Sequence, residues 1–551
     1  VLLGQNVGQF SIRGGRVHLA DDILFRDEPV RMLRIFQIAQ DYDADIHPHA
    51  LKRITRALPS IGAQTREDRE ANELFISILT SRKNPERILR LMNESGVLGK
   101  FLPDFGRIVA MMQFDMYHSY TVDEHTIKTI GVLHQIESNE LAKTAPVATH
   151  VMPEIESRRA LFVAMFLHDM AKGRGGDHSI LGAELALTLC RGLGLTREET
   201  ETVSWLVKYH LLMSKTAFRY DLNDPKTIQD FADIVQSPER LKLLLVLTVA
   251  DIRGVGPNIW NGWKAALMRD LYSRADAVLR GADPEAISAG SAIESQRAVR
   301  EELASWSDEE FATHASNLPV SYWSSFDTRS QVTHAELSRE FRQQEVPLLI
   351  DLRPEISRRI TEMTVLTIDD AGLFSRIAGA VASSGVTIVG ARIATCSDGS
   401  VLDVFILQTT ENEAVRDPLI LERLQKNVEE AITGSFRANS MLNARWRQTP
   451  KRVRHMPVLS RVILSNKISS THTVIEINGR DFPGLLYQIT KTIASLGLQI
   501  QSSSVSTYGE RVVDVFYVKD LFGLQIHNEA RLQTIKEKLL AVFDMANEVA
   551  S

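Results

Sequence analysis

Cysteine is scarce in this sequence, because its 551 residues contain only Cys190 and Cys396. Two cysteines so far apart imply neither a disulfide framework nor a cysteine-based zinc site. Apolar runs of the roughly 20 residues that a membrane-spanning helix needs are missing as well, and no secretory signal opens the chain. We therefore expect a cytoplasmic protein with no membrane segment.

A large excess of charge is also missing. The chain has 63 basic and 69 acidic residues and a formal net charge of -6. This balance argues against nucleic acid as the main partner. Its 44% hydrophobic and 24% charged residues are ordinary for a globular protein. The length predicts about three to five domains.

The first 25 residues alternate apolar and polar side chains around Gly14 and Gly15, which predicts a short β-hairpin. A helical pattern follows and continues to about residue 115. This opening resembles the junction between a nucleotidyltransferase domain of the DNA polymerase β-like kind and its helical companion. The catalytic signature of that family, a Gly-Ser turn followed by Asp-x-Asp, is not in the sequence. We therefore interpret 1–25 as the remnant of such a domain, 26–115 as a helical domain, and the sequence as a piece of a longer protein.

The most distinctive motif is FLHDMAKGRGGDHS at 166–179, within a region of helical pattern at 116–350. An apolar helical run ends in His168 and Asp169, and two other apolar helices carry His125 and Asp251. Imidazole and carboxylate groups are ligands of divalent cations, and polar groups on apolar helices need partners. The order H…HD…D resembles the HD phosphohydrolase superfamily, in which these four residues bind the metal. The resemblance implies an all-α HD-type metal phosphohydrolase domain, with a helical extension, at 116–350.

Further residues near this motif have predicted roles. His178 and His210 either hold a second ion or a phosphate, or form only local hydrogen bonds. Lys172 and Arg174 are predicted to act with Asp169 in catalysis, because cations neutralise charge that gathers on phosphoryl oxygens. The predicted cofactor is one or two divalent ions, Mg²⁺ or Mn²⁺.

After about residue 355 the pattern changes to strands alternating with shorter helices, and it occurs twice. Gly372 and Gly385 are thirteen residues apart, as are Gly484 and Gly497. Each copy ends in a strand that contains Asp-Val-Phe, and the aspartate of this tripeptide is Asp403 or Asp514. The copies resemble ACT domains, small α+β modules of βαββαβ order that bind amino acids. We place them at 360–435 and 471–551, joined by a basic linker at 436–470.

The turn between the first strand and the first helix of each copy is the predicted ligand site. A helix N-terminus has unpaired N–H groups that suit a carboxylate, and a flanking aspartate suits an amino group. The alternative is a structural turn without a ligand. The residues predicted to bind the amino acid are Asp369, Asp370, Gly372 and Leu373 in the first copy, and Asp481, Pro483, Gly484 and Leu485 in the second.

In this order, the motifs resemble the uridylyltransferase/uridylyl-removing enzymes of bacterial nitrogen control. That resemblance implies an HD domain that hydrolyses UMP from a tyrosine of the PII signalling protein, and an ACT pair that senses glutamine. It also implies that the intact protein attaches UMP to PII from UTP. Two alternatives stay open: an HD hydrolase of a free nucleotide such as an alarmone, and a non-catalytic regulator that senses amino acids.

Overall fold

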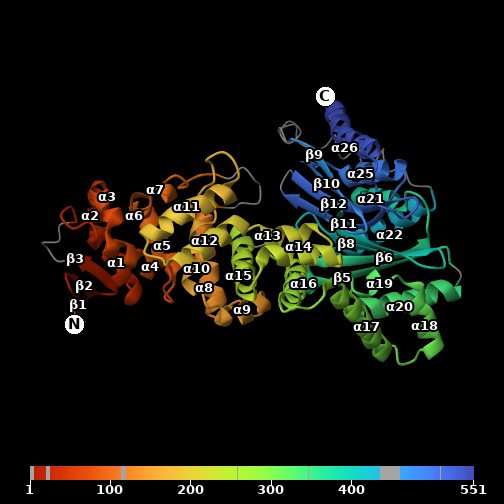
Figure 1. Cartoon of the computed structure of the whole chain (residues 1–551), viewed down its shortest axis with the longest axis horizontal. Coiled ribbons are helices and arrows are strands. Elements are labelled where there is room, and N and C mark those ends of the chain that lie inside the picture. The colour runs from red at the N-terminus through yellow and green to blue at the C-terminus, as the bar shows by residue number, and fades with distance from the viewer. Residues whose placement is uncertain are drawn as a thin grey trace. The chain divides into compact units, whose positions relative to one another are not determined.

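The computed structural model of the chain describes residues 5–19, 25–112, 120–256, 259–344, 346–434, 459–508 and 511–550. The chain forms two compact units (Figure 1). The first contains Val1–Ser214 and Val235–Trp260, and the second contains Lys215–Ile234 and Asn261–Ser551. Most of the predicted linker, 436–458, lies outside the described residues. The domain boundaries given above stay predictions.

The first unit begins with a small sheet of strand order β1-β2-β3-β4. Gly14 and Gly15 both have positive φ and form the turn of the hairpin expected from the sequence, between β2 and β3. Short helices follow the sheet. The strands are β1 (Gln5–Val7), β2 (Phe10–Arg13), β3 (Arg16–Leu19) and β4 (Asp45–Ile46), and the helices are α1 (Arg31–Asp41), α2 (Pro48–Ala57), α3 (Ala63–Glu67), α4 (Arg69–Leu79), α5 (Pro85–Glu94), α6 (Val97–Phe101) and α7 (Pro103–Gly106).

Longer helices form the rest of the first unit. Every residue from Ala160 to Leu167 in α10 is buried, so this helix is surrounded by its neighbours. Helix α8 packs against α10 and α15, and α10 packs against α12. In the described part of the chain, no helix is both long and apolar enough to cross a bilayer. The helices are α8 (Val122–Glu137), α9 (Pro146–Val151), α10 (Arg158–Leu167), α11 (His178–Gly192), α12 (Arg197–Tyr209) and α15 (Pro238–Val255).

The second unit is built on an eight-stranded sheet of order β5-β6-β8-β7-β11-β12-β10-β9. The two predicted copies form its two halves, and β7 of the first pairs with β11 of the second. The strands are β5 (Leu348–Glu355), β6 (Ile360–Ile368), β7 (Thr387–Thr395), β8 (Ser400–Gln408), β9 (Arg461–Ser465), β10 (Thr473–Arg480), β11 (Leu498–Tyr508) and β12 (Arg511–Asp520). The helices of the two copies are α21 (Leu373–Ser383), α22 (Pro418–Ile432), α25 (Leu485–Ser495) and α26 (Glu529–Ala550).

The predicted α+β class is confirmed, but the connectivity is shifted by one strand. Each copy has the order ββαββα, because its outer edge strand, β5 or β9, comes first in sequence instead of last. In either order, the strand in question lies at the same edge of the four-stranded sheet of its copy. The periodicity of a strand does not say which copy of a repeat it joins, so the sequence did not show this shift.

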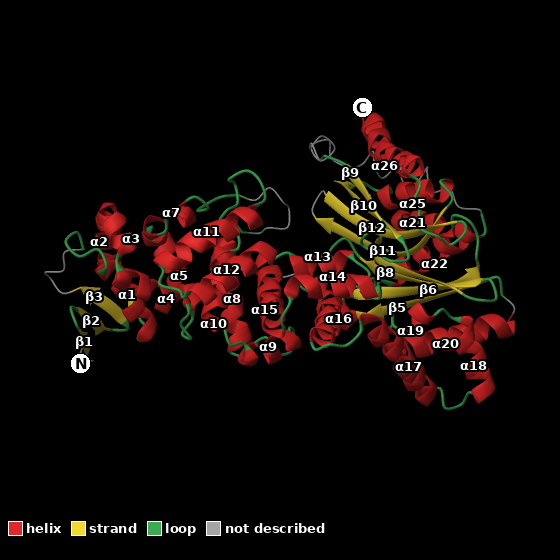
Figure 2. Cartoon of the chain, viewed as in Figure 1, coloured by secondary structure: helices red, strands yellow, loops and turns green. Residues whose placement is uncertain are grey.

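Helices cover both faces of the sheet (Figure 2). Val401 and Phe405 of β8 pack beneath α21 and α22, whereas Leu402 and Val404 pack on the opposite side. That side of the first copy is covered by helices that the sequence grouped with the preceding HD domain. They are α16 (Gly262–Leu279), α17 (Pro284–Glu302), α18 (Asp308–Asn317), α19 (Val320–Trp323) and α20 (Thr328–Gln344).

The same side of the second copy contacts a segment that precedes these helices. The chain enters the second unit within α13 (Leu212–Arg219) and leaves it at the end of α14 (Pro225–Val235). Between them, Tyr220 packs against Val474, Val515 and Tyr517 of the sheet. The chain therefore leaves the HD region at residue 215, contacts the sheet of the second unit, and returns at residue 235. We call residues 215–234 the excursion.

We expect Gly262→Ala to destabilise the second unit by about 1–3 kcal/mol, the usual cost of overpacking. An added Cβ would lie 2.6 Å from the Ser357 carbonyl oxygen and 2.8 Å from the Arg358 Cα, and these backbone atoms cannot rotate away. Urea unfolding measures the change. The control is Gly290→Ala in α17, where no atom lies within 4 Å of the added Cβ. It should be neutral or slightly stabilising, and equal losses in both variants would contradict the close contact at Gly262.

Candidate metal centre

Six predicted ligands converge in the first unit, and each lies at or near a helix end. Helix ends bring side chains together from different directions, while the apolar helix bodies pack around them. His125 is in the first turn of α8, His168 and Asp169 follow α10, His178 begins α11, His210 follows α12, and Asp251 is in the last turn but one of α15.

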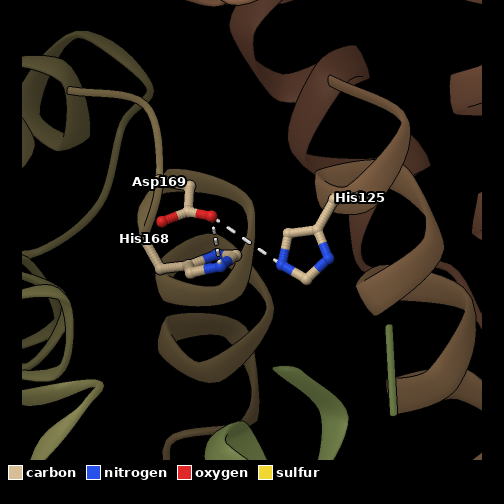
Figure 3. A group of neighbouring side chains, drawn as sticks. All are labelled: His125, His168 and Asp169. Atoms are coloured by element: carbon tan, nitrogen blue, oxygen red, sulfur yellow. Dashed lines mark ion pairs between the residues drawn. The ribbon is translucent and has the colours of Figure 1, made fainter. Parts of the chain in front are cut away.

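One group contains His125, His168 and Asp169, and Figure 3 shows their side chains facing one another. Nε2 of His168 lies 3.3 Å from Oδ2 of Asp169, and Nε2 of His125 lies 3.7 Å from the same oxygen. Asp251 joins this group, because its Oδ1 lies 3.0 Å from Nε2 of His125 and 3.5 Å from Nε2 of His168. Two imidazoles and two carboxylates therefore point at one small volume.

A second group contains Asp169, His178 and His210. Nε2 of His178 lies 3.6 Å from Oδ1 of Asp169. The ring centroids of His178 and His168 each lie 5.3 Å from that of His210. Asp169 belongs to both groups and turns one oxygen toward each. This arrangement suits two ions that share a bridging carboxylate.

The ring orientations of His168 and His210 are fixed by the backbone. In each case Nδ1–H donates to the carbonyl oxygen three residues earlier, from His168 to Met165 and from His210 to Val207, at 2.7 Å. Nε2 is therefore the ring nitrogen that faces the cluster, and it would offer its lone pair to a cation in place of a proton. Nε2 of His168 is buried and has no hydrogen-bond partner in the described part of the chain. These are the features of a metal-ligating imidazole.

Buried charges dominate the electrostatics of the cluster. Burial alone would raise the pKa values of Asp169 and Asp251, but His168 and other cationic or donor groups hold both pKa values well below the usual range. Burial opposes charge on His168 too, yet Asp169 and Asp251 raise its pKa to about 10. Burial and the charge of His168 lower the pKa of His210 to about 4. Two carboxylates thus stay ionised inside the unit and attract positive charge.

This donor set fits divalent cations. Neutral imidazole nitrogen and ionised carboxylate oxygen are the ligands that such ions accept in catalytic sites. His125, His168, Asp169 and Asp251 would hold one ion, and Asp169, His178 and His210 a second. A pair of ionised carboxylates, one buried and one partly buried, also needs compensating charge.

The two predicted catalytic cations have different surroundings. Nζ of Lys172 lies 2.6 Å from Oδ2 of Asp169 and is partly exposed at the rim of the cluster. Arg174 instead forms an ion pair with Asp104 at 2.5 Å. The geometry therefore associates Lys172 with the cluster and holds Arg174 on α7. The catalytic roles of both residues stay predictions.

Sequence reasoning did not identify several supporting groups. The carbonyl groups of Met165 and Val207 orient two histidines, and backbone groups leave no signal in a sequence. Gly254 lies one turn after Asp251, where an added Cβ would be 2.4 Å from Thr129 and 3.4 Å from the His125 ring. In the sequence, a glycine three residues after the predicted ligand Asp251 was the one sign that another helix packs closely there. It allows α15 to approach α8.

The predicted amino-acid turns lie in the second unit. Gly372 and Gly484 are the N-cap residues of α21 and α25, with φ of 79° and 90°, and no side chain caps either helix. Leu373 and Leu485 are buried in the core, so only their backbone groups can face a ligand. The carboxylate of Asp370 pairs with Arg376 at 2.6 Å.

The remaining predicted residues of these turns differ in exposure. Asp369 and Pro483 are exposed, whereas Asp481 is only partly exposed. Burial raises the pKa of Asp481 to about 6. Ligand binding at these turns stays a prediction.

We expect Asp169→Asn to weaken Mn²⁺ binding by at least about 100-fold. Loss of an outer partner of a ligand already costs about 10- to 100-fold, and Asp169 contributes to both groups. His210→Gln should affect only the second group and leave one ion bound. Metal content after gel filtration measures the number of bound ions in each variant, and Mn²⁺ titration followed by electron paramagnetic resonance measures their affinity. His134→Gln, on α8 but outside the cluster, is the control. Wild-type Mn²⁺ binding by Asp169→Asn would rule out this site.

Comparisons with known proteins agree with this geometry. Residues 10–101 match the family model described as the uridylyltransferase GlnD third domain, residues 122–252 match the HD domain, and residues 468–545 match the ACR family N-terminal ACT domain. The HD match contains all six converging residues. An HD domain is a metal-dependent phosphohydrolase, and the buried cluster of histidine and aspartate is consistent with that chemistry.

Curated relatives are similar over nearly the whole chain. Bifunctional uridylyltransferase/uridylyl-removing enzymes are 50% identical over 538 residues in Azospirillum brasilense, 47% over 537 in Rhodospirillum rubrum and 43% over 540 in Gluconobacter oxydans. These alignments cover 97–98% of this chain but only 57–58% of each relative. They confirm the resemblance stated from the motifs.

Proposed function

We propose that this chain removes UMP hydrolytically from a uridylylated tyrosine of the PII signalling protein, and that glutamine bound by the ACT pair regulates the reaction. The observation that carries the proposal is the buried cluster in which Asp169 joins two groups of histidines. It lies within the HD match. The names of the relatives support uridylyl removal as the reaction.

The bond to be broken is a phosphodiester between UMP and a phenol. Bound Mg²⁺ or Mn²⁺ supplies a nucleophilic hydroxide near neutral pH and charge that stabilises the phosphoryl oxygens. Tyrosine has a pKa near 10, so its phenolate leaves more readily than an aliphatic alkoxide. The chain therefore needs to position the ester and offset developing negative charge, and has little need of a strong general acid.

The residues of the cluster have distinct tasks in this proposal. Asp169 and Asp251 remain ionised and hold positive charge in place. His168 and His210 keep Nε2 directed inward because their Nδ1–H groups are bonded to the backbone. Lys172, held by Asp169 at the rim, offers its ammonium group to the phosphoryl oxygens.

Regulation requires a connection between the ACT pair and the cluster, and the excursion from the HD region supports one. Residues 215–234 lie between His210 and Asp251 in sequence, but they pack within the second unit. There, Asp221 accepts a hydrogen bond from Ser502 at 3.0 Å and forms an ion pair with Arg392 at 3.5 Å. Its N–H donates to the Tyr517 hydroxyl at 2.8 Å.

The partners of Asp221 mark the junction of the two copies, because Ser502 and Arg392 are opposite each other where β11 pairs with β7. Burial would disfavour a charge on Asp221, but Arg392 and hydrogen bonds lower its pKa. We propose that a change at this junction on glutamine binding shifts residues 215–234 and, through the chain, His210 and Asp251. His210 and Asp251, two of the predicted metal ligands, lie before and after the excursion in the same chain.

The name of the relatives includes a second activity. We propose that the protein containing this chain also transfers UMP from UTP to PII, because the relatives are uridylyltransferases as well. The Gly-Ser and Asp-x-Asp signature is not in this sequence, so that activity requires residues outside it.

We expect this polypeptide to release UMP from uridylylated PII in the presence of Mn²⁺ or Mg²⁺, and we expect glutamine to increase the rate. Chromatography of the released nucleotide measures the reaction. Chelation should stop it, because the cation supplies the hydroxide nucleophile and the charge that stabilises the phosphoryl oxygens. Asp169→Asn is the inactive control. Hydrolysis of free nucleotides with no release from PII would favour the alarmone alternative, and no hydrolysis of either would favour a non-catalytic regulator.

A separate prediction concerns coupling. Asp221→Asn preserves size but removes the ion pair with Arg392, so it should reduce most of the glutamine stimulation while basal UMP release persists. Coupled sites typically change affinity by about 5- to 150-fold, which makes the loss measurable as the ratio of rates with and without glutamine. The matched control is Asp230→Asn, in the same excursion, whose carboxylate pairs with Lys226 at the surface. Unchanged stimulation in Asp221→Asn would exclude the junction as the route.

A further inference from the structure

Two buried aspartates occupy equivalent places in the two ACT copies, and neither has a role in the function proposed above. Asp403 is 2% exposed and Asp514 is 1% exposed. Oδ1 of each is buried and has no hydrogen-bond partner among the described residues. Each is the first residue of the Asp-Val-Phe tripeptide that the sequence repeats, within β8 or β12.

Both carboxylates lie in the same layer of the fold. Asp403 alternates along β8 with Val401 and Phe405, which pack in one cluster with Leu373 and Phe374 from the first turn of α21. It is opposite Val365 of β6 and Ile393 of β7. The side chain is therefore on the face that α21 and α22 cover, where the ring of Phe405, two residues further along β8, lies 5.2 Å from that of Phe374 in the first turn of α21.

The second copy repeats this placement. Asp514 alternates along β12 with Val512 and Phe516, which pack in one cluster with Leu485 at the start of α25. It is opposite Ile477 of β10 and Val505 of β11. Each copy thus has a buried aspartate on the sheet face that its two helices cover, beside an apolar cluster to which the first turn of a helix belongs.

The turn before each of these helices carries a second carboxylate, Asp369 or Asp481, which interacts electrostatically with the buried aspartate. Burial raises the pKa of Asp403 well above its ordinary value, and the charge of Asp369 raises it further. Burial and the charge of Asp481 do the same for Asp514, against a hydrogen bond from the Ser506 backbone. Two acids so placed repel each other when ionised, and a bound cationic group would relieve this cost.

The helix above supplies the opposite charge. The N-termini of α21 and α25 have no side-chain cap, so their first N–H groups and the positive end of the helix dipole can hold an anion. A metal cation would be repelled by that helix end. A zwitterion satisfies both sets of groups, with its carboxylate at the helix and its ammonium at the aspartates.

We propose that Asp403 and Asp514 are binding residues for the ammonium group of a free α-amino acid, one molecule in each ACT copy. The inference rests on the proposed glutamine sensing and adds to it the residues that recognise the amino group. In each copy, the ammonium lies between the turn aspartate, Asp369 or Asp481, and the buried aspartate beneath it.

The position of Asp403 also means that a bound amino acid would displace the turn above it. Asp369, Asp370 and Ala371 are exposed, whereas Asp403 beneath them is buried. An ammonium group that reaches Asp403 must displace the turn. The Cβ position of Gly372 in this turn lies 3.9 Å from Ala494 near the end of α25, so displacement of one turn reaches the helix of the other copy.

The test is calorimetric titration of the full chain with L-glutamine and with its deamino analogue, which has hydrogen in place of the ammonium group. Asp403→Asn and Asp514→Asn should each lose one of two glutamine sites, with affinity reduced by about ten-fold or more. Both variants should bind the deamino analogue as the wild type does. Their melting temperatures should stay equal or rise, because a neutral amide replaces a buried acid.

Asp417→Asn is the matched control, since asparagine caps α22 as well as aspartate does. Wild-type glutamine affinity in Asp403→Asn and Asp514→Asn would overturn the inference and leave glutamine sensing intact. Equal loss of glutamine and deamino analogue, with a lowered melting temperature, would also overturn it by showing a structural role. A wild-type chain that does not bind glutamine, but releases UMP, would overturn glutamine sensing itself.

Discussion

Two ionised carboxylates inside the first unit, Asp169 and Asp251, set the main constraint on its structure. A charge in an apolar interior is costly unless other charges or donors surround it. The unit meets this requirement by ending several apolar helices at the same place, so that histidines and Lys172 face the two acids. The helix bodies, above all α10, pack around that place and hold the side chains in position. A site for cations is thus a direct consequence of how the helices pack.

The eight-stranded sheet imposes a different constraint on the second unit. Because β7 pairs with β11, the two copies share one set of backbone hydrogen bonds and cannot shift independently. Helices α21 and α25 also pack against each other above that junction. The residues that contact Asp221 lie at the same junction on the other face. The junction of β7 with β11 therefore connects the predicted amino-acid turns on one face with the excursion on the other.

The sequence was most informative where residue type and helical position together determine the chemistry. His168 and Asp169 at the end of an apolar helix indicated a cation site, and the structure places His125, His178, His210 and Asp251 around them. The repeat of glycines and of the Asp-Val-Phe strands likewise indicated two similar α+β modules. In both cases the signal is local, or repeats at a fixed spacing.

Long-range packing was not predictable in the same way. Arg174 was expected at the phosphate, but it pairs with Asp104, a contact over 70 positions that no periodicity reveals. The helices of 262–344 were grouped with the HD domain by composition alone, whereas their apolar faces match the sheet. Asp403 and Asp514 were noticed only as repeat markers, because burial without a partner is a property of the folded chain.

The excursion at 215–234 makes the two units inseparable by any single cut. The chain passes from one unit to the other three times, so a truncation that deletes the ACT copies would leave this segment behind. Tyr220 would lose its packing against Tyr517, and Asp221 would lose Arg392, Ser502 and the Tyr517 hydroxyl. Gene truncations and protease-trimmed forms would therefore carry a newly exposed, aggregation-prone patch between two predicted metal ligands. Loss of activity in such forms would report damage to the metal cluster as much as loss of the proposed sensor.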